Sequence, residues 1–198
     1  MNRIVFASNN AGKVREVASL LEPTGLNVVP QSVYLVSEAE ESGLTFVENA
    51  ILKARNACRH TSLPALADDS GLVVDALAGE PGIYSARFAG ENATDADNNT
   101  LLLAELAGIP ERQRTARYQC LMVYLRNAED PTPIICQGSW EGRILSEPRG
   151  SGGFGYDPLF WLPDRGCSVA ELQPDVKNRL SHRGHALRAL VEAMTNHR

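Results

Sequence analysis

The sequence predicts a mixed α/β fold, and two parts of the chain carry this prediction. Residues 3–7 form an apolar run typical of a buried strand, and a polar loop at 8–13 leads into a helical pattern of apolar residues that ends at Pro23. Residues 115–125 alternate between apolar and polar side chains, and 134–144 return as their partner after a turn at 127–133. A strand-loop-helix start combined with an antiparallel pair indicates a mixed sheet flanked by helices.

Length and composition restrict the class of protein. The 198 residues suit one domain, or two lobes that share one sheet, and 43% apolar with 22% charged residues is ordinary for a soluble globular protein. A net charge of -5 argues against a nucleic-acid partner, although it is compatible with a local basic pocket for a small anion. No apolar run approaches the roughly 20 residues that span a bilayer, and no signal peptide is visible, so we expect a cytoplasmic protein without a membrane partner. The four cysteines are too widely spaced for a metal pair and are expected to be buried thiols: Cys58, Cys120, Cys136 and Cys167.

The polar loop after the first strand is a candidate anion site. It consists of Ser8, Asn9, Asn10, Ala11, Gly12 and Lys13. Backbone N–H groups and the positive end of the helix dipole favour an anion at such a junction, and Lys13 adds a full charge. The glycine spacing and Val14 exclude a Walker A loop. A capped helix start without a ligand is an equally good interpretation of this stretch alone.

An acidic loop leads into a second helix. The loop contains Glu38, Glu40 and Glu41, and acidic runs of this kind are usually solvated. Thr45 and Glu48 have the spacing of a capping box and predict the helix start. Asn49, Lys53 and Asn56 share its polar face. Lys53 is therefore either a solvated lysine or, if this face lines a cleft, a second phosphate contact.

Two adjacent carboxylates mark the stretch 66–77 as the expected centre of the chemistry. Asp68 and Asp69 end an apolar run, and Ser70 and Gly71 precede a second one. Because successive strand side chains point to opposite faces, both acids can face one ligand only if the chain turns, which Gly71 permits. We expect one acid to act on a divalent cation or a water while the other supports it. The alternative is a solvated turn.

Two later loops are also informative. Residues 79–90 form an irregular Gly/Pro-punctuated loop of functional length, and Thr94 then caps a helix. Residues 150–158 contain four glycines around Phe154, so backbone is expected to approach a ligand while an aromatic ring is presented. Phe154 either stacks on a nucleobase or lies with Tyr156 in the core of a hairpin.

The last part of the chain places basic side chains near a helix start. Ser181 is a natural N-cap of a final amphipathic helix. Lys177, His182 and Arg183 are expected to cluster there, where an anion or a carbonyl oxygen would be bound. A surface position is the alternative for the His-Arg pair.

Taken together, these motifs resemble the Ham1-like nucleoside triphosphate pyrophosphatases. The matching segments are SNNAGK at 8–13, TFVENAILKAR at 45–55, LADDSGL at 66–72, PGIYSAR at 81–87, GGFGYDP at 152–158 and SHRG at 181–184. Each motif alone is weak, but six in family order over essentially the whole chain are specific. Ser8 stands where the family loop more often has Thr, which keeps the hydroxyl.

The resemblance implies a single domain over 1–198, an elongated mixed α/β fold with an active-site cleft between two lobes, and a homodimer. It also implies Mg²⁺-dependent conversion of ITP, dITP or XTP to the monophosphate and pyrophosphate. Asp69 matches the family's general base and metal-linked acid. Glu40 or Glu41 is expected to supply a further metal ligand, with Glu40 preferred. The positions that match substrate contacts are residues 8–13, Ser70, Phe154, Gly155, Tyr156, Asp157, Lys177, His182 and Arg183.

The expected mechanism follows from these matches. Asp69 deprotonates a water that attacks the α-phosphorus, while Lys13 and Lys53 hold the phosphates. A 6-oxo purine accepts a hydrogen bond where adenine donates one, so donors from His182 or Arg183 would select deaminated bases. Guanine also carries the 6-oxo group and must be rejected elsewhere. The rival interpretations are a Maf-like pyrophosphatase with another base preference, an inactive nucleotide-binding module and a phosphatase that releases orthophosphate.

Overall fold

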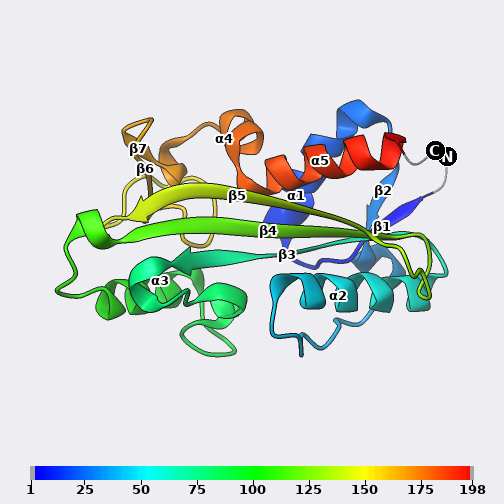
Figure 1. Cartoon of the computed structure of the whole chain (residues 1–198), viewed down its shortest axis with the longest axis horizontal. Helices are drawn as coiled ribbons and strands as arrows, with labels where there is room; N and C mark the ends of the chain where they lie inside the picture. Colours follow the sequence, from blue (N-terminus) through cyan, green and yellow to red (C-terminus); the bar gives the residue numbers. More distant parts are fainter. Residues whose placement is uncertain (1–2, 197–198) are drawn as a thin grey trace. The chain divides into compact units, whose positions relative to one another are not determined.

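The computed structural model describes residues 3–196 and contains a seven-stranded sheet in the order β2-β1-β3-β4-β5-β6-β7 (Figure 1). The strands are β1 (Ile4–Phe6), β2 (Val28–Pro30), β3 (Ala65–Val74), β4 (Thr115–Leu125), β5 (Ile134–Ile144), β6 (Phe160–Leu162) and β7 (Cys167–Ser168). The α-helices are α1 (Ala11–Leu21), α2 (Phe46–Thr61), α3 (Asp95–Glu105), α4 (Pro174–Leu180) and α5 (His182–Asn196). Short 3-10 helices are η1 (Glu22–Thr24), η2 (Gln31–Tyr34), η3 (Asp75–Leu77), η4 (Gly82–Arg87), η5 (Glu111–Gln113) and η6 (Val169–Glu171).

The sheet is mixed, as predicted. β1 pairs in parallel with both β2 and β3, whereas β6 pairs antiparallel with β5 and β7. The two long strands predicted at 115–125 and 134–144 are neighbours in the sheet. The α/β class and the mixed sheet are therefore confirmed.

The chain divides into two compact units. The first contains the segment that ends at Asp69, then Cys120–Gly138, and the segment that begins at His182; the second contains Ser70–Gln119 and Ser139–Ser181. Strands β3, β4 and β5 each contribute one part to each unit. The cleft that the resemblance implies between two lobes stays a prediction.

The first unit has apolar layers on both faces of β1 and β3. Ile4, Phe6 and Leu66 pack with α1 and α5, whereas the alternate residues of the same strands pack on the alanines of α2. Figure 1 shows α2 on one side of these strands and α1 with α5 on the other. Alternation along a strand sends neighbouring side chains to opposite faces, so residues that follow Leu66 are directed in turn toward α1 and α5 or toward α2.

The second unit has its own core, built on the far parts of the long strands. α3 contributes Leu102 and Leu106, which pack with Tyr118 and Phe160. The rings of Tyr118 and Phe160 stack with centroids 4.4 Å apart. This core supports α3 on one side and the loop that precedes β6 on the other.

Two of the three predicted helix caps are observed. Thr45 is the N-cap of α2, and its side chain accepts the N–H of Glu48. Thr94 caps α3 in a complete capping box with Asp97. Ser181 directly precedes α5, as expected from its residue type. Local side-chain chemistry thus sets where these helices begin.

One local expectation is wrong. β3 runs without interruption from Ala65 to Val74, so the chain does not turn at Ser70 and Gly71. Eight of the ten strand positions are buried, and the ladder with neighbouring strands outweighs the turn preference of Ser-Gly. Asp68 and Asp69 therefore point to opposite faces of β3, which separates their roles.

The expectation of buried thiols is confirmed for two of the four cysteines. All four cysteines are free thiols; Cys58 and Cys120 are buried, and Cys136 and Cys167 are half-buried. Burial raises the pKa of Cys120 to about 12 and that of Cys58 to about 11, so both stay protonated at neutral pH. Within residues 3–196, no helix is long and apolar enough to cross a membrane.

Candidate active site

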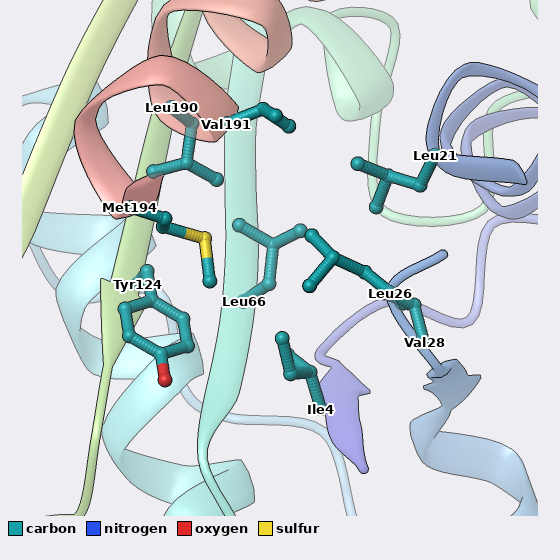
Figure 2. A pocket seen from close by; sticks show the side chains of 9 residues that line it. All are labelled: Ile4, Leu21, Leu26, Val28, Leu66, Tyr124, Leu190, Val191 and Met194. Carbon is teal, nitrogen blue, oxygen red and sulfur yellow. The ribbon is translucent and has the colours of Figure 1, made fainter. Parts of the chain in front are cut away.

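A small apolar hollow in the first unit is not the site. Its volume is about 10 Å³, which is room for no more than about one water molecule. Figure 2 shows its lining side chains directed toward one another: Ile4, Leu21, Leu26, Val28, Leu66, Tyr124, Leu190, Val191 and Met194. Apart from the hydroxyl of Tyr124 these side chains offer no polar group that could hold a ligand. Two buried charged side chains of the same strand, Asp68 and Asp69, follow Leu66 in the sequence.

The loop at 8–13 connects β1 to α1 and is both capped and cationic. The side chain of Asn10 accepts the N–H of Lys13 at 3.0 Å, and Ser8 Oγ accepts the N–H of Asn10 at 3.2 Å. A side-chain cap satisfies only part of the first turn, so other N–H groups stay directed out of the helix end. The ammonium of Lys13 lies 3.2 Å from Asp68 Oδ2. The loop thus combines the two features that favour a bound anion.

Asp68 is the centre of a buried ion-pair network on the α1 and α5 face. Its Oδ2 accepts from Arg183 Nη2 at 3.1 Å and Nε at 3.3 Å, and Arg183 Nη1 also donates to Glu16. Burial by itself would raise the pKa of Asp68, but the charges of Lys13 and Arg183 outweigh it and hold this pKa well below its ordinary value. Asp68 is therefore a permanently ionised carboxylate that organises Lys13 and Arg183.

Asp69 faces α2 and has a different environment. Its Oδ1 accepts from Lys53 Nζ at 2.6 Å, while its Oδ2 is buried and has no hydrogen-bond partner within residues 3–196. Burial raises the pKa of Asp69 in spite of the nearby charges of Lys53 and Lys13. A buried carboxylate oxygen without a donor is rare in folded proteins and is suited to a cation or a water. Asp68 and Asp69 therefore differ in the cations that they bind and in the direction in which their pKa values are displaced.

The acidic loop brings Glu41 to this group, and not Glu40. Lys53 Nζ donates to Glu41 Oε1 at 3.0 Å in addition to Asp69, so one ammonium joins the two carboxylates. Glu40 is exposed, and no ion pair of Glu40 is found within residues 3–196. The preference for Glu40 as the second metal ligand is therefore not supported by the geometry, which favours the alternative, Glu41. Metal binding itself stays a prediction for both.

The polar face of α2 fastens the acidic loop. Asn56 Nδ2 donates to the carbonyl of Ser37 at 2.7 Å, and buried Asn49 accepts the N–H of Gly43 through Oδ1 at 2.8 Å. Glu48 Oε2 accepts the N–H of Leu44 at 2.9 Å. Sequence reasoning grouped Asn49, Lys53 and Asn56 on one face but assigned no role to the asparagines. Their spacing in the helix was the available signal.

The loop at 153–157 is organised by Asp157 in the second unit. Asp157 Oδ2 accepts from Lys177 Nζ at 2.6 Å and from the N–H of Phe154 at 2.9 Å, and Oδ1 accepts from the Tyr118 hydroxyl at 3.1 Å. The ammonium of Lys177 lies 4.4 Å from the centroid of the Phe154 ring. Tyr156 is buried in the core and donates to the carbonyl of Ser85 at 2.8 Å. Tyr156 thus follows the core alternative, whereas Phe154 is only half-buried and does not lie in the core with it.

The three basic residues predicted to cluster near the last helix are divided between the two units, and their clustering stays a prediction. Lys177 binds Asp157 in the second unit, and Arg183 binds Asp68 in the first. His182 begins α5, is 6% exposed, and is packed closely by Gly138, where an added Cβ would lie 2.1 Å from the His182 carbonyl oxygen. Ser70 lies half-buried in β3.

Gly153 provides a test of this loop. Gly153 has a φ of +75°, and an added Cβ would lie 2.0 Å from Asp157 Oδ2. Gly153→Ala is expected to displace the carboxylate from Phe154 and to lower the free energy of unfolding by about 1–3 kcal/mol, as measured by urea denaturation. Gly155→Ala is the matched control, because its φ of +62° carries the same backbone strain while an added Cβ meets nothing within 4 Å. Equal losses for both variants would show that the contact with Asp157 is unimportant.

Comparison with known proteins places this arrangement in a wider context. The family model described as "Ham1 family" matches residues 4–193. A protein of Shigella flexneri named dITP/XTP pyrophosphatase is 58% identical over 196 residues, which is 99% of this chain and 100% of that protein. A protein of the same name from Thioalkalivibrio sulfidiphilus is 60% identical over 192 residues, 97% of this chain and 98% of that protein. The solved structure of a HAM1 protein from Coxiella burnetii, 47% identical, has a TM-score of 0.91 and covers 99% of this chain and 100% of its own.

Proposed function

The chain belongs to the Ham1 family, and from this premise we propose that it is a nucleoside triphosphate pyrophosphatase acting on non-standard purine nucleotides. ITP, dITP and XTP would be converted to the monophosphate and pyrophosphate. The observation that carries the proposal is that relatives named dITP/XTP pyrophosphatase align with essentially the whole chain at 58–60% identity. Removal of deaminated purines from the nucleotide pool would follow from this activity. A homodimer and a cytoplasmic location are further parts of the proposal.

The triphosphate is proposed to bind at the loop 8–13 and at Lys53. The start of α1 directs backbone N–H groups and the positive helix end outward, and Lys13 adds an ammonium that already faces Asp68. Lys53 stands between Asp69 and Glu41. Both lysines are held by carboxylates before substrate arrives, so they are oriented without a further loss of side-chain entropy.

The carboxylates fit the Mg²⁺ that the family implies. Asp69 Oδ2 is buried without a donor, and Glu41 is linked to Asp69 through Lys53. No group of three His, Cys, Asp or Glu side chains within residues 3–196 could hold a metal. Mg²⁺ is commonly bound by one or two carboxylates together with substrate phosphates, so two acids are sufficient here. The metal would neutralise the charge that develops on the leaving pyrophosphate.

Asp69 is proposed as the general base toward the water that attacks the α-phosphorus. The buried oxygen of Asp69 offers an acceptor position for that water, and Lys53 fixes the other oxygen. Asp68 Oδ2 is paired with Lys13 and Arg183, and the lowered pKa of Asp68 makes it the weaker base of the two. The opposite pKa displacements of these two neighbours are the pattern expected for a working acid and its support.

Selection of a 6-oxo purine is proposed to depend on a hydrogen-bond donor near the base. His182 and Arg183 were the expected donors, but the Arg183 guanidinium donates to Asp68 and Glu16 and is 2% exposed. To contact the base, the Arg183 guanidinium would have to give up its hydrogen bond to one of these two carboxylates. The half-buried ring of Phe154 under Lys177 is proposed to stack on the base.

The proposal is tested by phosphorus NMR of the products from ITP, dITP and XTP, with GTP and ATP as comparison substrates. Monophosphate and pyrophosphate are expected from the first three and only in the presence of Mg²⁺. Chelation by EDTA should abolish turnover without changing the melting temperature, because Lys53 already supplies both acids with a counter-charge before metal and substrate bind. Release of orthophosphate would place the attack at another phosphorus and contradict the assignment of Asp69. A melting temperature that fell sharply with EDTA would contradict the two-acid site.

A further inference from the structure

We propose that Asp95 and Asn99 of α3 are positioning residues for nucleotide recognition, because they fix the loop that carries Phe154. The inference rests on the proposed function and adds to it two residues that contact neither phosphate nor reacting atoms. Their expected effect is on nucleotide affinity and base selectivity. The chemistry at Asp69 is expected to be unaffected.

Both backbone groups of Gly155 are held by side chains of α3. The N–H of Gly155 donates to Asp95 Oδ2 at 2.6 Å, and Asn99 Nδ2 donates to the carbonyl oxygen of Gly155 at 2.9 Å. Asp95 and Asn99 are four residues apart and therefore share one face of the helix. The residue that follows Phe154 is thus held through both its backbone donor and its backbone acceptor.

The loop needs an external support of this kind. Gly153 and Gly155 both have left-handed backbone angles, with φ of +75° and +62°. Glycine loses more conformational freedom than any other residue when it is ordered, so a stretch with two such glycines has no rigidity of its own. Asp157 holds the N–H of Phe154 on one side, and α3 holds Gly155 on the other. The direction of the Phe154 ring is set between these two anchors.

α3 is rigid where it contacts the loop. The capping box of Thr94 and Asp97 closes its first turn. Buried Asn98 accepts the N–H of Ala89 at 2.8 Å and donates to the carbonyl of Ala86 at 3.2 Å, which ties the same turn to the end of η4 and to the residues that follow it. Leu102 and Leu106 anchor the next turns in the core. The helix therefore holds Gly155 at a defined position and does not move with the loop.

The contacts are separable from the stability of the unit. Asp95 is exposed, and the Oδ1 atom of Asn99 has no partner within residues 3–196, so the bonds to Gly155 are the polar contacts that a substitution would remove. A hydrogen bond to a charged group contributes more free energy than a neutral one. Without either anchor the Phe154 ring would populate several orientations, and fixing one of them would cost conformational entropy when the nucleotide binds. We expect KM for ITP and the dissociation constant of IMP to rise about tenfold, with kcat within about twofold.

The experiment compares Asp95→Ala and Asn99→Asp with two controls. Asn99→Asp keeps the shape of the side chain but faces a carboxylate oxygen toward the Gly155 carbonyl oxygen. Asp95→Asn is the conservative rescue, since its amide oxygen can still accept the Gly155 N–H. Thr100→Ala changes an exposed residue of the same helix whose hydroxyl bonds only back to the carbonyl of Ala96. For each variant, kcat and KM are measured with ITP and ATP, IMP binding by calorimetry, and the melting temperature by circular dichroism.

Support requires weaker IMP binding, a raised KM and a smaller preference for ITP over ATP in Asp95→Ala and Asn99→Asp, with near wild-type values in both controls. The positioning role would be overturned by unchanged KM and IMP binding or by an effect confined to kcat. It would also be overturned by an Asp95→Asn variant as impaired as Asp95→Ala. Failure of the proposed function is separately visible in the wild type, which would then release no pyrophosphate. A wild type that binds no IMP would overturn both.

Discussion

Asp69→Asn is expected to keep nucleotide binding and to lower kcat by about 10²–10⁴-fold, the range associated with loss of a general base. Asparagine has the size of aspartate, and its amide oxygen can still accept a hydrogen bond from the ammonium of Lys53. In the wild type this ammonium donates to Asp69 Oδ1 at 2.6 Å. The second position would become an amide nitrogen, which can neither take a proton from water nor bind a cation. The substitution therefore removes the chemistry while it preserves the packing.

Single-turnover kinetics with ITP and calorimetry with IMP distinguish these effects. The control is Asp164→Asn, which removes one exposed carboxylate far along the chain from the site and should leave both quantities unchanged. If Asp69→Asn turned over ITP at nearly the normal rate, Asp69 would not be the base. A loss of IMP binding equal to the loss of rate would instead assign Asp69 to substrate binding.

Arg183→Met is expected to lower the free energy of unfolding by about 3–5 kcal/mol, the cost typical of removing one partner of a buried ion pair. Arg183 is 2% exposed and serves two carboxylates, Asp68 and Glu16. Methionine fills much of the same volume, so the loss reports the charge and not a cavity. Without the guanidinium, Asp68 keeps Lys13 as a cation but remains fully buried.

Urea denaturation followed by circular dichroism measures this loss. Arg179→Met is the matched control, because that guanidinium is exposed and lies 4.0 Å from Asp175 in a surface pair, and its loss should change stability by less than about 0.5 kcal/mol. Adding Asp68→Asn to Arg183→Met should recover part of the loss, since it removes the uncompensated charge. An Arg183→Met variant as stable as the wild type would show that the network contributes nothing to folding.

The stability role of Arg183 affects how its proposed contact with the base is tested. A loss of ITP preference in Arg183→Ala could follow from displacement of Asp68 and Lys13 alone. The preference is therefore informative only when the variant is shown to be folded, and a comparison with Arg183→Lys is the better experiment, because lysine keeps the charge but not the forked geometry.

The sequence by itself determined most of the local structure. The strand at β1, the helix starts at Thr45 and Thr94, and the α/β class all follow from neighbouring residues, because hydrogen bonds within a turn and alternation within a strand are local. The resemblance of its motifs likewise predicted the family. The one local failure was the expected turn at Ser70 and Gly71, where pairing with neighbouring strands kept β3 extended.

Only the tertiary structure decided which partners each acid has. Strand alternation predicts that Asp68 and Asp69 diverge, but not that α1 and α5 cover one face and α2 the other. The partners that separate them are distant in sequence: Arg183 is 115 residues from Asp68, and Glu16 is 167 residues from Arg183. Two further contacts also join residues that are distant in the sequence. Lys53 pairs with Glu41, and Gly155 is held by Asp95. Ion pairs of this kind leave no periodic signal in the chain, because they depend on which surfaces meet after the helices pack.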